Sequence, residues 1–120
     1  MAIILIVENE IFIRQSAEWM MEEMGHQPLV ACALGEAIVH LSAEATIDAL
    51  FVDMRLSELA LGGYDVANQA IALKPGLRVL YTSETPLTAA MTTRFVPGEQ
   101  LLQKPHSHKD LGPSMEQLLA

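Results

Sequence analysis

The chain has 120 residues, 51% of them hydrophobic, and carries a formal net charge of -8. This length and composition are typical of one compact domain with its own core and exclude a long disordered tract, so we expect a single domain over residues 1–120. Seven basic residues against 15 acidic ones argue against a nucleic-acid partner, which would need clustered positive charge.

The apolar run at residues 3–7 is too short to span a bilayer. It also lacks the basic start and the small-residue cleavage site of a signal peptide. We therefore expect a cytoplasmic protein that has no membrane partner.

Apolar runs alternate with helical patterns along the chain. Ile3–Val7 predicts the first strand, and apolar residues at helical spacing from Ile13 to Met24 predict a helix from about Glu10 to a stop at Gly25. Further strands are predicted at residues 28–33, 49–52, 78–82 and 101–102, and further helices through residues 37–41, 64–73 and 108–119. Residues 83–100 leave room for only a short helix. This alternation predicts an α/β fold with a parallel sheet.

Polar residues stand where four of the predicted strands end. They are Glu8-Asn9, Asp53, Thr82-Ser83 and Lys104-Pro105. In a parallel sheet these ends lie along one edge, where open α/β folds bind their ligands. A carboxylate, an amide, a hydroxyl and an ammonium group in one place suit the capture of a phosphoryl group together with a divalent cation.

With these residues in this order, the whole chain resembles the receiver domain of two-component response regulators. In that family a pair of acids ends strand one, an aspartate ends strand three, Thr or Ser ends strand four and Lys-Pro ends strand five. The resemblance implies a flavodoxin-like three-layer sandwich, in which a five-stranded parallel sheet of order 2-1-3-4-5 has helices on both faces.

The resemblance also implies roles for three of these residues. Asp53 would accept a phosphoryl group from a histidine kinase or a histidine phosphotransfer protein. Lys104 and Thr82 would each bind a phosphate oxygen, the first as a point charge and the second through its hydroxyl. The domain would then signal to a downstream protein by a conformational change, and homodimer formation stays open.

A magnesium ion is implied at the same place. By position, Glu8, Asn9, Asp53 and the backbone carbonyl of Arg55 would hold Mg²⁺, which prefers hard oxygen donors and would neutralise charge on the transferring group.

Two positions depart from the family. Asn9 stands where most receivers have a directly ligating aspartate, so the site has one negative charge fewer and is expected to bind Mg²⁺ more weakly. Leu101 stands three residues before Lys104, where the family usually has an aromatic residue whose rotamer follows the Thr or Ser. Leucine cannot reproduce that movement, so output is expected through another surface.

These departures define the main alternative, a degenerate receiver that acts as a protein-interaction module without being phosphorylated. The joint presence of Asp53, Thr82 and Lys104 favours a phosphorylatable domain. A flavodoxin-like cofactor binder would need a phosphate-binding loop where Glu8-Asn9 stands, and a haloacid dehalogenase-like phosphatase would need an acid where Arg55 stands. We therefore expect a signalling domain and no enzyme acting on a separate substrate.

Two further features have competing interpretations. Phe12 and Trp19 lie seven residues apart on the first predicted helix, where they form either a docking patch or part of the core. We expect Trp19 to be buried against the closing helix around Met115 and Leu119. Cys32 lies in an apolar stretch, and we expect it to be buried and inert.

Overall fold

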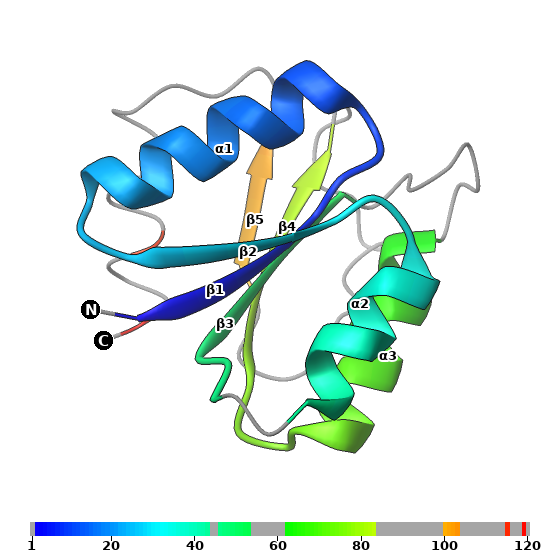
Figure 1. Ribbon diagram of the computed structural model, residues 1–120. Helices are drawn as coiled ribbons and strands as arrows, with labels where there is room; N and C mark the ends of the chain where they lie inside the picture. Colours follow the sequence, from blue (N-terminus) through cyan, green and yellow to red (C-terminus); the bar gives the residue numbers. More distant parts are fainter. Residues whose placement is uncertain are drawn as a thin grey trace.

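The computed structural model describes residues 2–43, 46–53, 62–83, 100–103, 115 and 119, with side chains except at 62–65, 83 and 100–103. Within these residues, five strands form one parallel sheet of order β2-β1-β3-β4-β5 (Figure 1). The strands are β1 (Ile3–Val7), β2 (Gln27–Ala31), β3 (Ala49–Asp53), β4 (Arg78–Ser83) and β5 (Gln100–Gln103). The helices are α1 (Ile11–Glu23), α2 (Leu34–Ser42) and α3 (Gly62–Leu73).

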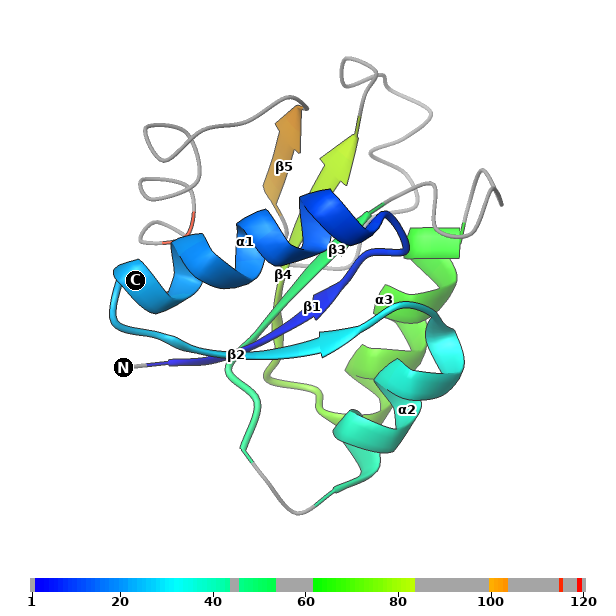
Figure 2. The same cartoon turned by 45° about the horizontal axis from the view of Figure 1, so that its top comes forward.

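Helices cover both faces of the sheet, which gives three layers. Helix α1 lies on one face, and α2 and α3 lie together on the other (Figures 1 and 2). Successive strand residues point to opposite faces, so Ile4 and Ile6 join the core under α1, whereas Leu5 and Val7 join the core under α2 and α3. The predicted α/β sandwich and its strand order are thus confirmed.

The central strand β3 shows why the pattern works. All of its residues, Ala49–Asp53, are buried. Phe51 packs in the core under α1, and Leu50 and Val52 pack in the core under α2 and α3. A strand covered on both faces has a continuous run of apolar residues in its sequence, and in β3 an aspartate follows that run.

Helix α1 ends as the sequence predicts. Gly25 has φ 85°, a left-handed conformation that favours glycine, and its N–H donates to the Glu22 carbonyl (3.0 Å). The N–H of His26 donates to the Met21 carbonyl (2.9 Å). Together these bonds form a Schellman motif, which satisfies the last carbonyls of the helix and turns the chain into β2.

The predicted strand boundaries agree with the structure within two residues. The largest difference is at β2, which ends at Ala31 rather than residue 33, because Ala33 is already the N-cap of α2. Of the predicted closing helix, positions 115 and 119 are described and both are helical, with Met115 in the core under α1. The weak segment 84–99 lies outside the described residues.

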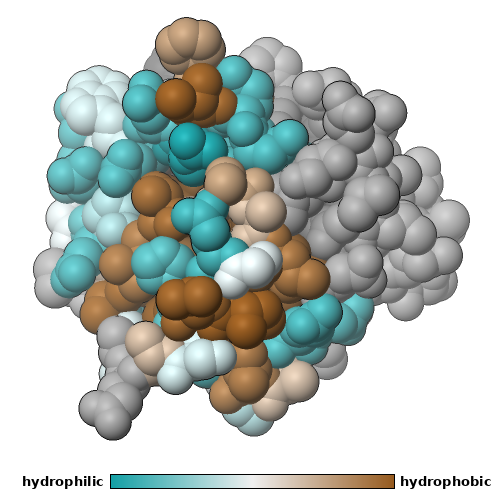
Figure 3. Space-filling view, turned by 45° about the vertical axis from the view of Figure 1, so that its right-hand side comes forward, coloured by the Kyte–Doolittle hydropathy of each residue, from teal (hydrophilic) through white to brown (hydrophobic). Residues whose placement is uncertain are grey.

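Apolar side chains also remain at the surface on both sides of the sheet. Phe12 and Trp19 are exposed on α1, and Val39 and Leu73 are exposed on α2 and α3. Figure 3 shows apolar side chains gathered on the side of the molecule that α2 and α3 form.

None of the helices in the described part of the chain combines the length and apolar character that a membrane span requires.

Candidate functional site

Three adjacent strands bring polar residues to one edge of the sheet. Asp53 is the last residue of β3 and is in register with Thr82 of β4. On the other side of β3, Val52 is in register with Val7, so Glu8 leaves β1 at the level at which Asp53 leaves β3. The predicted convergence of Glu8, Asp53 and Thr82 is what the strand register produces.

These three residues are also the buried polar residues of the described chain. Glu8 is 1% exposed, Asp53 is 7% exposed and Thr82 is fully buried. Burying a carboxylate costs free energy unless it is paired, hydrogen-bonded or coordinated, so two buried carboxylates at one sheet edge mark this edge as a candidate site. Asn9, by contrast, is exposed.

The hydroxyl of Thr82 has an unusual environment. Its Oγ1 is buried and finds no hydrogen-bond partner among the described residues. A buried hydroxyl of this kind costs about 1–3 kcal/mol relative to a satisfied one. Thr82 is the register partner of Asp53, so this hydroxyl and the Asp53 carboxylate belong to adjacent strand ends.

The donor set fits a hard divalent cation. Glu8 and Asp53 offer carboxylate oxygens and Asn9 offers an amide oxygen, which are the ligand types that Mg²⁺ takes alongside water. Across the residues that the structure describes, no group of three His, Cys, Asp or Glu side chains is arranged to hold a metal. A cation at this edge would need further oxygen ligands beside the two carboxylates.

No family model and no curated protein matches the sequence, but solved structures match nearly the whole chain. A response regulator receiver protein from Sinorhizobium medicae is 24% identical with a TM-score of 0.85, over 98% of this chain and 94% of that one. A CheY-like receiver domain protein from Methanospirillum hungatei is 19% identical with a TM-score of 0.84, over 99% and 94%. The receiver domain of the hybrid histidine kinase CckA is 25% identical with a TM-score of 0.82, over 98% and 99%. The chain has the response regulator receiver fold.

The receiver fold bears out the family resemblance at the level of structure. Of the predicted site residues, Glu8, Asn9, Asp53 and Thr82 stand at the edge described above, whereas Arg55 and Lys104 lie outside the described residues. Leu101 lies on β5 opposite Tyr81, which is fully buried in the core under α2 and α3. The roles predicted for all six of these site residues stay predictions.

The prediction that Cys32 is buried is wrong. Cys32 is exposed, because β2 ends at Ala31 and the next residues lead out of the receiver sheet into α2. Glu36, in the first turn of α2, accepts hydrogen bonds from both the Cys32 N–H (3.0 Å) and the Cys32 thiol. Ala33 offers no side-chain cap, and Glu36 instead reaches back from the third helical position to the residue before the N-cap.

This contact shifts the pKa values of both side chains. The hydrogen bond to Glu36, with burial and the carboxylate charge adding to it, raises the pKa of Cys32, and the same bond lowers the pKa of Glu36. No sequence pattern predicts this contact, although an acid three residues into a helix is a usable signal for capping.

A thiol held in its protonated form should react slowly. We expect Glu36→Gln to lower the pKa of Cys32 and to raise its rate of alkylation by iodoacetamide several-fold near pH 8, because the thiolate is the nucleophile. Mass spectrometry of timed samples measures the rate, and Glu22→Gln, at an exposed position near the far end of α1, is the control. Equal rates in the wild type and Glu36→Gln would contradict this effect of the carboxylate.

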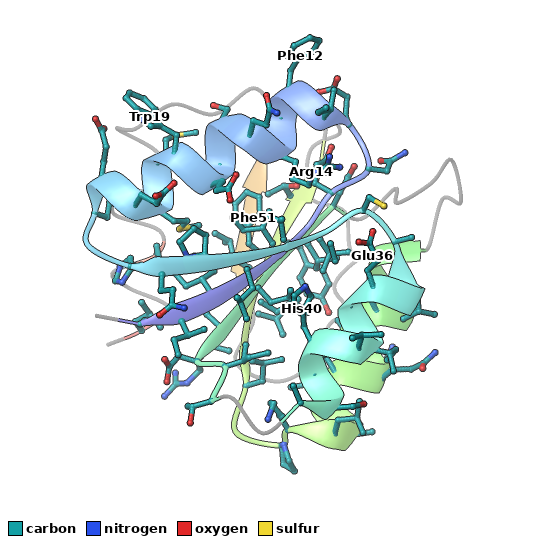
Figure 4. All side chains as sticks on the ribbon, viewed as in Figure 1. Phe12, Arg14, Trp19, Glu36, His40 and Phe51 are labelled. Carbon is teal, nitrogen blue, oxygen red and sulfur yellow. The ribbon has the colours of Figure 1, made fainter. Side chains whose placement is uncertain are left out.

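The expectation that Trp19 is buried is also wrong. Trp19 is 56% exposed and Phe12 is 76% exposed, and both point away from the body of the domain on the outer side of α1 (Figure 4). The core position under α1 is taken by Ala17, Met20 and Met21, with Met115 packed against them. The docking patch, the alternative interpretation of Phe12 and Trp19, stays a prediction.

One residue of the site region is not indicated by the sequence motifs. Arg14, on α1, donates from Nη1 to the backbone carbonyl of Glu8 (3.0 Å). A basic residue in the first turns of a helix that follows an acidic strand end is the signal that could have pointed to it.

Proposed function

We propose that this chain is a response regulator receiver that accepts a phosphoryl group on Asp53 and signals through the resulting change in conformation. The observation that supports this most strongly is the pairing of Asp53 with Thr82 at adjacent strand ends, where the carboxylate is nearly buried and the hydroxyl lacks a partner among the described residues. The receiver fold of the chain agrees with it.

In the proposed transfer, an oxygen of Asp53 attacks the phosphorus of a phosphohistidine. A P–O bond forms, the P–N bond breaks, and the imidazole nitrogen leaves with the electron pair of that bond and takes up a proton. Thr82 donates its hydroxyl to one phosphate oxygen, and Lys104 binds another. Mg²⁺, held by Glu8, Asn9, Asp53 and the carbonyl of Arg55, supplies charge neutralisation when bound.

The partners in this proposal are a histidine kinase or a histidine phosphotransfer protein, and a downstream target protein. Phe12 and Trp19 give α1 an exposed apolar surface, and α1 begins close to the site. Such a surface suits docking of the phosphoryl donor. The CckA neighbour is the receiver domain of a hybrid histidine kinase, and this agrees with a role in two-component signalling. A cytoplasmic location is part of the same proposal.

A degenerate receiver that binds proteins without phosphorylation is the second candidate. Two observations favour it: Asn9 replaces a charged metal ligand, and leucine occupies position 101 on β5. Neither accounts for two buried carboxylates beside a buried hydroxyl that has no partner among the described residues, which a purely structural module has no reason to maintain.

Intact mass spectrometry after incubation with phosphoramidate and Mg²⁺ distinguishes the two candidates. We expect the wild type to gain one phosphoryl mass and Asp53→Asn to gain none. Asp48→Asn is the matched control, because Asp48 lies just before the other end of β3, where its side chain accepts the Ile3 N–H (2.8 Å). A wild type that gains no mass with phosphoramidate or with a phosphorylated phosphotransfer protein would favour the degenerate receiver.

A second test concerns the metal. We expect Asn9→Asp to lower the dissociation constant for Mg²⁺ about tenfold, since a charged oxygen would replace a neutral one next to a doubly charged ion. Isothermal titration calorimetry measures the constant. Gln15→Glu adds the same charge at an exposed position of α1 and should change it little. If both variants had the same effect, Asn9 would not be a metal ligand.

A further inference from the structure

Arg14 reaches from α1 to the strand end that carries the site. It is partly buried, and its Nη1 donates a hydrogen bond to the Glu8 carbonyl oxygen at 3.0 Å. In Figure 4 it lies on the side of α1 that faces the sheet, opposite to the exposed Phe12 and Trp19. A guanidinium bound to a backbone carbonyl restrains the peptide that follows, here the one between Glu8 and Asn9.

The rest of this connection is restrained too. The N–H of Glu8 donates to the Ala31 carbonyl of β2 (3.1 Å). One residue beyond Asn9, the Glu10 carboxylate caps α1 by accepting the Ile13 N–H (2.7 Å). Asn9 is therefore an exposed residue between two fixed neighbours, and Arg14 supplies the restraint on its N-terminal side.

We propose that Arg14 is a positioning residue that holds the Glu8–Asn9 peptide in the geometry that binds the divalent cation. This inference rests on the proposed function, because it concerns the same metal site. A neutral amide oxygen attracts a cation less than a carboxylate does, so a site that uses Asn9 depends more on having its ligands placed in advance.

Arg14 has two opposite effects on the binding of a nearby cation. Its positive charge repels the ion, whereas its hydrogen bond orders two of the ligands. The negative charge of Glu36, which interacts with Arg14, reduces this repulsion. The hydrogen bonds from Cys32 lower the pKa of Glu36, and the charge of Arg14 lowers it further. We therefore expect the ordering effect to be the larger one.

Isothermal titration of Mg²⁺ into the full chain tests this directly. We expect Arg14→Met, which removes both charge and donor, to weaken Mg²⁺ binding about tenfold, as loss of an outer-shell partner typically does. Arg14→Lys, which retains a charged donor, should recover part of the affinity. Arg78→Met is the matched control, since Arg78 begins β4 at the opposite end of the sheet.

A second readout is independent of the metal. Amide hydrogen exchange measured by NMR should be faster at Asn9 and Glu10 in Arg14→Met than in the wild type, and unchanged in Arg78→Met. Unchanged exchange, or Mg²⁺ binding by Arg14→Met that equals or exceeds that of the wild type, would overturn the positioning role alone. A wild type that binds no Mg²⁺ would overturn the proposed metal site, and the role of Arg14 with it.

Discussion

Replacing Phe51 with alanine is expected to lower the free energy of unfolding by about 3–5 kcal/mol. Phe51 is fully buried at the centre of the middle strand β3, where its register partners Ile6 and Leu80 are fully buried as well. All three lie in the core under α1. A cavity there has little room to collapse, because rigid strands flank it on both sides.

Urea denaturation followed by circular dichroism measures this change. A domain of this size has a total stability of about 5–15 kcal/mol, so the variant should show a much lower midpoint or be largely unfolded. Phe51→Leu, which leaves a smaller cavity, should lose clearly less. Val39→Ala is the surface control, because Val39 is 71% exposed and its truncation should change stability by less than about 0.5 kcal/mol. A similar loss in Val39→Ala would contradict the assignment of the core.

The hydrophobic pattern predicts this core well for a physical reason. Strands that are covered on both faces need apolar residues at every position, so residues 3–7 and 49–52 stand out as unbroken apolar runs in the sequence. The end of such a run is sharp, because a charged side chain is tolerated only where the strand leaves the core. The pattern alone therefore places Glu8 and Asp53 at the sheet edge.

The errors have an equally specific cause. The predictions for Cys32 and Trp19 depend on residue type and on neighbouring apolar residues, but exposure depends on where the chain leaves a layer. Cys32 follows β2 by one residue and is already outside the sheet. Trp19 lies on a helix whose core side is filled by Ala17, Met20 and Met21, so no space is left for the larger ring. Periodicity shows that a helix has an apolar side without showing which of two neighbouring apolar stripes is covered.

Hydrogen bonds to backbone groups are the other class of feature that sequence does not reveal. The contact between Arg14 and the Glu8 carbonyl links a helix to the strand end before it, and its geometry depends on how α1 crosses the sheet. The Glu36 contacts to Cys32 depend similarly on the start of α2. Both connect a loop at the site edge to the helix after it, so they bear on function although no motif marks them.

Replacing Thr82 with valine is expected to stabilise the fold while impairing phosphorylation. The hydroxyl of Thr82 is buried without a hydrogen-bond partner among the described residues, so a methyl group of nearly the same shape should raise the free energy of unfolding by about 1 kcal/mol. In the proposed function, the same change removes a donor to the phosphoryl group on Asp53, so it should slow phosphorylation by phosphoramidate about tenfold or more.

Thr82→Ser separates the two effects, because it retains the hydroxyl and removes the methyl group. It should lower stability by about 1 kcal/mol through the small cavity that it leaves, yet retain most of the phosphorylation rate. Urea denaturation and timed intact mass measurements on the wild type, Thr82→Val and Thr82→Ser provide both quantities.

If Thr82→Val lost stability, the hydroxyl would have a partner in the unphosphorylated protein. If it were phosphorylated at the wild-type rate, Thr82 would not contact the transferring group. If Thr82→Val were the more stable variant and Thr82→Ser the faster one to be phosphorylated, the Thr82 hydroxyl would lower stability in the unphosphorylated protein and serve the phosphorylated state. That result would explain why a buried hydroxyl without a partner among the described residues stands at this strand end.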